Sequence, residues 1–303
     1  MEKIESTALK VGVLVNLIMA VAGWITYSLT NSDAMLLDGN FSFIAALSLI
    51  AAIMIVVVRH NKSETYPFGN YFYESFFVFF KGILILGITI AALFQNSIKI
   101  IDFFNGEETQ RILPGPIIYY IVLMTILSFG VAYYFGRKNK ELGNRSSILD
   151  VERKGAILDG FLSMAIGLAL YLTTLVDEES KLNFLLYVGD SFIVVIMCLF
   201  LMKMPLGVIK GAFRELGGGV IENDIIKGAI QEKIVKFLPV GFNLKQDYIT
   251  KLGSSYLVVI YISSETDKIS VKVLETYKKT LYDAIIADLS TVNIEVVLDN
   301  QTP

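Results

Sequence analysis

Histidine and cysteine are almost absent from this sequence. His60 and Cys198 are the only residues of their kinds among 303. A Cys/His zinc finger, a disulfide framework and a multi-histidine metal cage each need more of these side chains, so a single chain cannot form any of them. Charge is scarce as well, at 18% against about 25% in soluble domains. The formal net charge of -3 supplies no basic field, so we expect no nucleic-acid partner.

Apolar residues, by contrast, make up 54% of the chain, and they gather before residue 205. A membrane-spanning helix needs about 20 mainly apolar residues. Soluble helices rarely exceed about 20 residues with so few charges, which disfavours a large soluble protein with buried helices. The sequence therefore predicts an all-α, six-helix transmembrane domain over residues 1–205. Its spans lie at about 8–30, 34–58, 76–97, 114–135, 155–176 and 184–204.

The short loops differ in their content of Lys and Arg, which sets the orientation in a membrane. The loop between the second and third runs carries Arg59 and Lys62. The loop between the fourth and fifth runs is the most basic, with Arg137, Lys138, Lys140, Arg145, Arg153 and Lys154. The loops on the opposite side carry few basic and several acidic residues. We therefore predict a multi-pass cell-membrane protein with both termini in the cytoplasm.

The composition changes after Pro205. Residues 206–220 include three consecutive glycines and are predicted to form a linker. Residues 221–303 are predicted to form a small cytoplasmic α+β domain of the ferredoxin-like type. Its α-β-β-α-β order places two helices on one face of a three-stranded sheet. The expected elements are a helix at 222–237, strands at 246–252 and 256–262, a helix at 268–288 capped by Asp267, and a strand at 292–298.

Charged side chains inside the spans are candidate functional residues, because each one at bilayer depth costs at least about 2.5–3.5 kcal/mol. Asp38 and Asp159 are too short to extend far toward the interface. A serine follows each of them four residues later on the same helix face (Ser42 and Ser163). We take these residues as the candidate transport site, with Asp38 and Asp159 as its candidate metal ligands.

Lys81 and Asp190 are possible charge partners of this site. Lys81 lies at a depth similar to that of Asp159, and it either pairs with Asp159 or extends its long stem to the interface. Asp190 lies in the same half of the bilayer as Asp38. It either shares a layer with Asp38 or sits at the headgroup boundary.

Three local motifs and the predicted topology together resemble one known family. The most specific motif has Pro67, Gly69 and Glu74 at the family's spacing, although it begins with Tyr66 where the family has histidine. The motifs are NSDAMLLDG at 31–39, YPFGNYFYE at 66–74 and SSILDVE at 146–152. With them, the chain resembles the cation diffusion facilitator family of metal/proton antiporters. The resemblance implies proton-coupled efflux of a divalent cation and a homodimer joined through the cytoplasmic domains.

The chain departs from this family at the metal site. The family takes two ligands from the second span and two from the fifth, and only Asp159 is kept among the corresponding positions. Those positions are Phe41, Ala45, Gly155 and Asp159. Asp38 and Glu152 match acidic positions one turn earlier in each span. One carboxylate is too few for Zn²⁺, whereas Mn²⁺, Fe²⁺ and Mg²⁺ accept oxygen ligands and water. The expected cargo is therefore one of these harder cations, and no resident cofactor is expected.

Two other functions are open on the sequence alone. If Lys81 pairs with Asp159, its ammonium fills the former metal site, and the scaffold moves a non-metal solute such as a small organic cation. The chain could also be a non-transporting membrane scaffold whose cytoplasmic domain binds partners. An enzyme is not expected, because no Ser/His, Cys/His, phosphate-loop or close carboxylate arrangement is visible.

Overall fold

The computed structural model describes residues 2–299 except 60, 108, 110, 112–114, 144–145, 175, 177–178, 181, 265, 267–268, 288 and 290. The chain divides into two compact units. The first unit comprises residues 1–57 and 80–209, and the second comprises residues 58–79 and 210–303. The second unit therefore takes in the loop before the third helix, which the predicted boundary at residue 205 left in the transmembrane domain. His60 and the predicted cap Asp267 lie outside the described residues.

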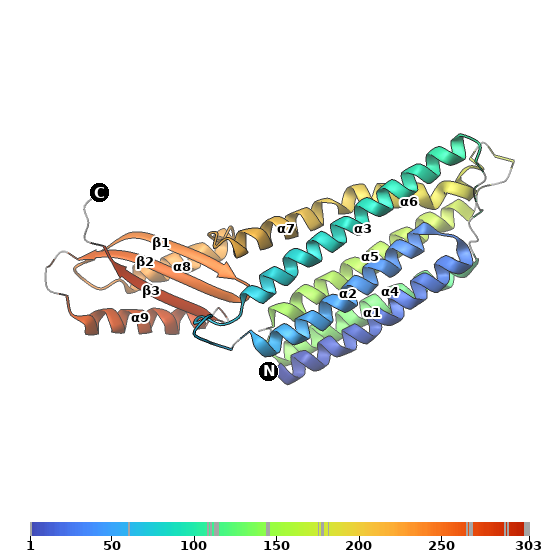
Figure 1. The fold of residues 1–303 in the computed structure, drawn as a ribbon. Helices are drawn as coiled ribbons and strands as arrows, with labels where there is room; N and C mark the ends of the chain where they lie inside the picture. Colours follow the sequence, from blue (N-terminus) through green and yellow to red (C-terminus); the bar gives the residue numbers. More distant parts are fainter. Residues whose placement is uncertain are drawn as a thin grey trace. The chain divides into compact units, whose positions relative to one another are not determined.

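Each predicted apolar run lies mostly in a helix (Figure 1). The helices are α1 Glu2–Thr30, α2 Asp33–Val58, α3 Phe72–Phe104, α4 Gly115–Glu141, α5 Ser147–Thr174 and α6 Leu185–Leu201. Among the described residues, five segments are long and apolar enough to cross a membrane: Ile4–Thr30, Asp33–Ile55, Phe72–Phe104, Ile117–Glu141 and Leu185–Leu216. Helix α5 is not among them, and its first half carries the charged residues Asp150, Glu152, Arg153 and Lys154. A sixth span along α5 therefore stays a prediction.

The first unit is built around a hydrophobic core to which α1, α2, α4, α5 and α6 contribute. Its buried members are Met19, Ala34, Met35, Leu37, Ile117, Tyr120, Met124, Ile166, Leu170, Val194 and Cys198. Helix α4 packs along α5, and α1 packs on α4. Other apolar side chains point outward, such as Phe94 on α3 and Phe200 on α6, which are 65% and 80% exposed. Outward faces of this kind suit hydrocarbon rather than water.

Helices α1 and α2 approach each other closely at two glycines. A Cβ atom added to Gly23 would lie 2.6 Å from the Cα atom of Gly39. Next to this contact, the indole Nε1 of Trp24 donates a hydrogen bond of 3.0 Å to Oδ1 of Asn40. Small residues let membrane helices pack backbone to backbone, where dispersion contacts replace the hydrophobic effect as the attractive force. The crossing therefore depends on the absence of a side chain at Gly23.

Helix α7 spans Lys203–Leu216 and takes the place of most of the predicted linker. Pro205 lies in its first turn, where the amide that proline lacks is not needed. The helix ends before Gly217, and the amide of Gly219 donates to the carbonyl of Arg214 over 2.9 Å. Glycine after the last helical residue is a common stop signal. The glycine run therefore ends a helix, and residues 206–216 are helical rather than irregular.

The second unit contains a small sheet with helices against it. Its elements are α8 Asp224–Phe237, β1 Phe242–Leu252, β2 Ser255–Ser264, α9 Val271–Ile286 and β3 Val292–Leu298. The sheet order is β1-β2-β3, with β1 antiparallel and β3 parallel to β2. The predicted α-β-β-α-β order is present. A ferredoxin-like fold has a further strand before its first helix, and the described residues before α8 form only the single bridge Val220–Thr250. The finer fold assignment stays a prediction.

One apolar cluster joins the sheet and both helices of this domain. It is formed by Ile230 and Ile234 of α8, Tyr277, Leu281 and Ile285 of α9, and Ile249, Val258, Ile260, Ile262, Val292 and Ile294 of the strands. Asn223 caps α8, since its Oδ1 accepts from the amides of Ile225 and Ile226. Helix α9 begins at Val271, three residues later than predicted, after the N-cap residue Ser270. The spacing of apolar residues therefore predicted the buried face of α9 correctly, but it predicted the start of the helix less accurately.

Replacing Gly23 by alanine is expected to destabilise the first unit by about 1–3 kcal/mol, because the added methyl group would overlap α2. Trp24 is the only tryptophan of the chain and lies beside the crossing, so its fluorescence reports thermal unfolding of the detergent-solubilised protein. Gly130→Ala is the matched control: no atom lies within 4 Å of its added Cβ. The control should unfold at the wild-type temperature or slightly above it. Equal melting temperatures for the two variants would contradict the close crossing.

Candidate functional site

Asp38 lies in the core of the first unit and is bonded to a neighbouring helix. Its side chain is in α2 and is 9% exposed. The phenol Oη of Tyr120 on α4 donates a hydrogen bond of 2.7 Å to Oδ2 of Asp38. A buried carboxylate needs such a donor, because an unpaired one is expensive in a low-dielectric interior. Tyr120 was not predicted as part of the site, and the spacing of residues in sequence contains no signal for it.

Asp159 on α5 is held differently. It is half-buried, and no hydrogen bond or ion pair of its carboxylate is found among the described residues. It lies within electrostatic range of Asp38, Lys81 and Glu152. The predicted serines Ser42 and Ser163 are also buried, at 1% and 2% exposure. The structure therefore brings the candidate site residues into the same unit, but it leaves Asp159 as a carboxylate without a direct partner.

Lys81 pairs with the other acidic residue of α5. Its Nζ lies 3.8 Å from Oε1 of Glu152, and both side chains are partly exposed. The expected alternative, an ion pair between Lys81 and Asp159, is not found among the described residues. Glu152 lies about two turns before Asp159 on α5. The length of the Lys81 side chain therefore determines which of the two carboxylates its ammonium group can contact. The ammonium group does not neutralise Asp159 by direct contact.

Asp190 belongs to a separate network at one end of the first unit. The ammonium of Lys99 on α3 donates to Oδ2 of Asp33 over 2.7 Å and lies 3.8 Å from Oδ1 of Asp190. The backbone amide of Asp33 donates to Oδ2 of Asp190 over 2.7 Å, so a carboxylate from α6 caps the start of α2. Asp190 is fully buried. Its partners thus include Lys99, the α2 terminus and the neighbouring Ser191, and no direct contact with Asp38 is found among the described residues.

The positions that correspond to the metal ligands of the resembled family offer few donor atoms. Phe41 packs against the core of the first unit, and Gly155 has no side chain. Within the described part of the chain, no three His, Cys, Asp or Glu side chains gather closely enough to hold a metal ion. Any cation bound here would have to use Asp159 together with neutral oxygens or water.

The motif that starts at Tyr66 forms the connection between α2 and α3. The amide of Gly69 donates to the carbonyl of Tyr66 over 3.1 Å, which closes a turn around Pro67. The side chain of Asn70 donates to the carbonyls of Val58 and Asn61. Tyr66 itself is 40% exposed. These contacts indicate that the motif has a structural role in this chain.

Glu74, the last residue of the motif, connects the start of α3 to the β1–β2 turn within the second unit. Its Oε1 lies 3.3 Å from Nη1 of Arg59 and accepts a hydrogen bond of 2.9 Å from Oγ of Ser254. Gly253 in the same turn has φ +58°, and a Cβ atom there would lie 2.5 Å from the carbonyl oxygen of Tyr71. The turn can approach the loop only because it has glycine at this position.

Ser75 makes a second connection beside Glu74. Its Oγ donates to Oε2 of Glu215 over 2.6 Å and accepts from the amide of Gly253 over 2.8 Å. Lys251 donates to the other oxygen of Glu215 over 3.1 Å. The start of α3, the end of α7 and the β1–β2 turn are therefore joined by one network of hydrogen bonds. Sequence reasoning missed this role of Ser75 and Lys251, because residues so far apart in the chain carry no local sign of contact.

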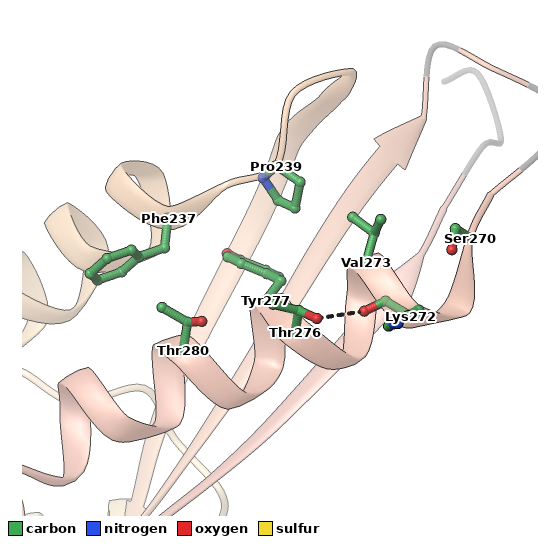
Figure 2. A pocket seen from close by; sticks show the side chains of 8 residues that line it. All are labelled: Phe237, Pro239, Ser270, Lys272, Val273, Thr276, Tyr277 and Thr280. Carbon is green, nitrogen blue, oxygen red and sulfur yellow. Dashed lines mark hydrogen bonds between the residues drawn. The ribbon is translucent and has the colours of Figure 1, made fainter.

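A pocket of about 450 Å³ lies between the end of α8 and the first turns of α9 (Figure 2). It is lined by Phe237, Pro239, Ser270, Lys272, Val273, Thr276, Tyr277 and Thr280. Burial raises the pKa of Tyr277 to about 12, so its hydroxyl stays protonated and donates to the carbonyl of Ile234. The hydroxyl of Thr276 donates to the backbone of Lys272. The lining contains no acid–base pair that would point to catalysis.

Long apolar helices with charged residues held in their interior define a multi-pass membrane protein. The chain matches the family described as the cation efflux transmembrane domain over residues 9–216. It therefore belongs to the cation diffusion facilitator family, and it is a membrane cation transporter in general terms. No curated protein matches the chain at a significant level.

Replacing Lys99 by methionine is expected to destabilise the first unit by on the order of 3 kcal/mol, because the buried carboxylate of Asp190 then loses its cation. Adding Asp190→Asn should recover much of this loss, since the unpaired charge is removed. Thermal unfolding in detergent measures both variants. Lys10→Met, at an exposed position of α1, is the control and should change stability by less than about 0.5 kcal/mol. An equal loss in the single and double variants would contradict the pairing.

Replacing Gly253 by alanine is expected to release the α2–α3 loop from the β1–β2 turn, because the methyl group would overlap the backbone of Tyr71. Hydrogen exchange of the amides around Ser75 should accelerate by about tenfold, which corresponds to about 1.4 kcal/mol. Gly106→Ala is the control for the cost of a positive φ: its φ is +89° and no atom lies within 4 Å of an added Cβ. If both variants leave this exchange unchanged, the turn does not hold the loop.

Proposed function

We propose that the chain is a proton-coupled exporter that moves a divalent cation out of the cytoplasm by alternating access. One observation carries the proposal: in a chain of the cation efflux family, Asp159, on the helix predicted to be the fifth span, has no hydrogen bond or ion pair of its carboxylate among the described residues. A charged group at bilayer depth is costly and is retained for a pathway or a partner. A proton or a cation can each neutralise this carboxylate, so the two compete for it.

Asp38 serves this site as a neighbour rather than as a free ligand. Its carboxylate accepts the hydrogen bond of Tyr120, which leaves one oxygen for another partner. The negative charge of Asp38 near Asp159 favours binding of a cation over an anion. The carboxylate of Asp159 and neutral oxygens form a donor set that suits Mn²⁺, Fe²⁺ or Mg²⁺ better than Zn²⁺. The cation is the cargo in this proposal, and no resident cofactor is needed.

The orientation and the assembly are also part of the proposal. Six spans, with α5 as the fifth, place both termini and the α-β-β-α-β domain in the cytoplasm, in agreement with the basic loops. The domain joins two copies of the chain into a homodimer. The bonds of Glu74 and Ser75 to the β1–β2 turn favour a domain that is tied to the start of α3. The chain acts as a transporter, with no enzymatic step.

The alternative cargo, a non-metal solute, depends on Lys81 filling the former metal site. The ammonium of Lys81 pairs with Glu152 instead, at 3.8 Å. No observation in the described residues favours a non-transporting scaffold over a transporter. The cation exporter is therefore the one function that we propose.

Replacing Asp159 by asparagine is expected to abolish Mn²⁺ flux that depends on a pH gradient, because the side chain of asparagine carries no charge and does not bind or release a proton near neutral pH. The measurement is Mn²⁺ uptake into proteoliposomes that contain the full chain, with an imposed pH difference. Asp150→Asn, on the same helix but 40% exposed and paired with Lys154, is the matched control and should transport normally.

Three results would count against the exporter. The first is a flux that Asp159→Asn leaves unchanged. The second is a flux of Mn²⁺, Fe²⁺ or Mg²⁺ that does not respond to the pH gradient. The third is the absence of flux for all three cations in the wild-type chain.

A further inference from the structure

Hydroxyl groups in the helices of the first unit differ in their hydrogen bonds. Several donate to the carbonyl four residues earlier. Thr30, Ser48 and Thr89 do so over 2.7 to 2.8 Å. The hydroxyls of Thr125, Ser128 and Ser163 are buried and have no hydrogen-bond partner among the described residues. A buried hydroxyl without a partner costs free energy, so each such group calls for a physical reason.

These three hydroxyls lie on two helices that pack directly against each other. A Cβ atom on Gly160 would contact the ring of Phe129, and one on Gly167 would contact Ile121. These contacts set the antiparallel register of α4 and α5. One helical turn from the Gly167–Ile121 contact, toward Gly160 and Phe129, Ser163 on α5 lies level with Thr125 on α4. It also places Asp159 and Ser128 within one turn of each other. The unpaired hydroxyls and the unpaired carboxylate therefore share one stretch of the α4–α5 seam.

The burial pattern shows that the two serines face the core of the unit. Ser128 follows Tyr120 and Met124 at intervals of four residues on the buried stripe of α4. Ser163 precedes Ile166 and Leu170 on the buried stripe of α5. These stripes meet in the same hydrophobic cluster. Both serines are only 2% exposed, so bulk solvent does not satisfy their hydroxyls.

We propose that Thr125 and Ser128 of α4, with Ser163 and Asp159 of α5, bind the transported divalent cation. This inference rests on the proposed function and names the residues of its site. In this chain the cation site lies on the α4–α5 seam, because the second-span positions are the apolar Phe41 and Ala45. Among the described residues no group donates a hydrogen bond to these hydroxyl oxygens, so their lone pairs can bind a cation.

The chemistry of this set defines the class of cation. One carboxylate and three hydroxyls are all oxygen donors, and together they carry a single negative charge. Hard cations that keep part of their water shell, such as Mg²⁺ and Mn²⁺, accept such a site, whereas Zn²⁺ favours nitrogen and sulfur ligands. Two other unpaired buried oxygens, on Ser32 and Asn96, lie outside α4 and α5 and are not part of this set.

The test is Mn²⁺ binding to the purified, detergent-solubilised full chain, followed by electron paramagnetic resonance of free Mn²⁺. The double variant Ser128→Ala with Ser163→Ala should weaken the Mn²⁺ affinity by at least about tenfold. Ser128→Thr keeps the hydroxyl and should retain more affinity than Ser128→Ala. Ser48→Ala, which removes a buried hydroxyl that is already bonded to the carbonyl of Ile44, is the matched control and should bind as wild type.

Thermal unfolding of the same samples separates binding from folding. Removing an unpaired hydroxyl removes a desolvation cost, so the double variant should be as stable as wild type or more stable. A stable double variant with unchanged Mn²⁺ affinity overturns the seam site. So does a loss of affinity that Ser48→Ala reproduces.

The outcomes also distinguish this inference from the proposed function. If Asp159→Asn abolishes flux while the serine variants bind and transport normally, the exporter stands and the α4–α5 site is wrong. If Asp159→Asn leaves flux unchanged, the proposed function fails, and the seam site fails with it.

Discussion

The cost of placing a polar atom in hydrocarbon governs the first unit. A bilayer interior offers no water, so every buried donor, acceptor and charge must find its partner inside the protein. Lys99 meets this requirement with Asp33 and Asp190, and Asp190 in turn caps the start of α2. Asp38 meets it with Tyr120. Among the described residues, three of the five buried side-chain oxygens that do not meet it lie on the α4–α5 seam, so that seam is the place to look for a ligand.

In the second unit, the family-like motif acts through its backbone, through its last residue Glu74 and through Ser75, which follows it. Histidines at the start of such a loop would suit a metal, but Tyr66 and Asn70 here serve only to shape the connection. Glu74 and Ser75 then bond to the β1–β2 turn, and Gly253 allows the approach. The motif thus keeps its place in the fold without a metal-binding side chain.

The hydrophobicity of each segment and the spacing of its apolar residues predicted most of the helices and strands. The apolar runs became helices, and the alternation at 292–298 became β3. Boundaries were less accurate: glycines at 217–219 suggested a linker that the structure replaces with α7, and α9 begins later than its pattern. The candidate residues Asp38, Asp159, Ser42 and Ser163 were chosen from depth and spacing alone. Their partners could not be chosen in this way, because Tyr120 and Lys99 stand in other helices at positions that no spacing rule connects.

The sequence by itself determined the class of protein, because membrane-spanning length, apolar composition and short motifs are properties of continuous segments. It also excluded a metal cage of several histidines within one chain, since the chain contains one histidine. Only the tertiary structure decided which charges meet. Asp33 and Asp190 are 157 positions apart, and Glu74 and Ser254 are 180 apart. Partners at such separations are set by how helices pack and how far a side chain reaches. The structure therefore pairs Lys81 with Glu152, and within the described part of the chain it shows no direct partner of Asp159.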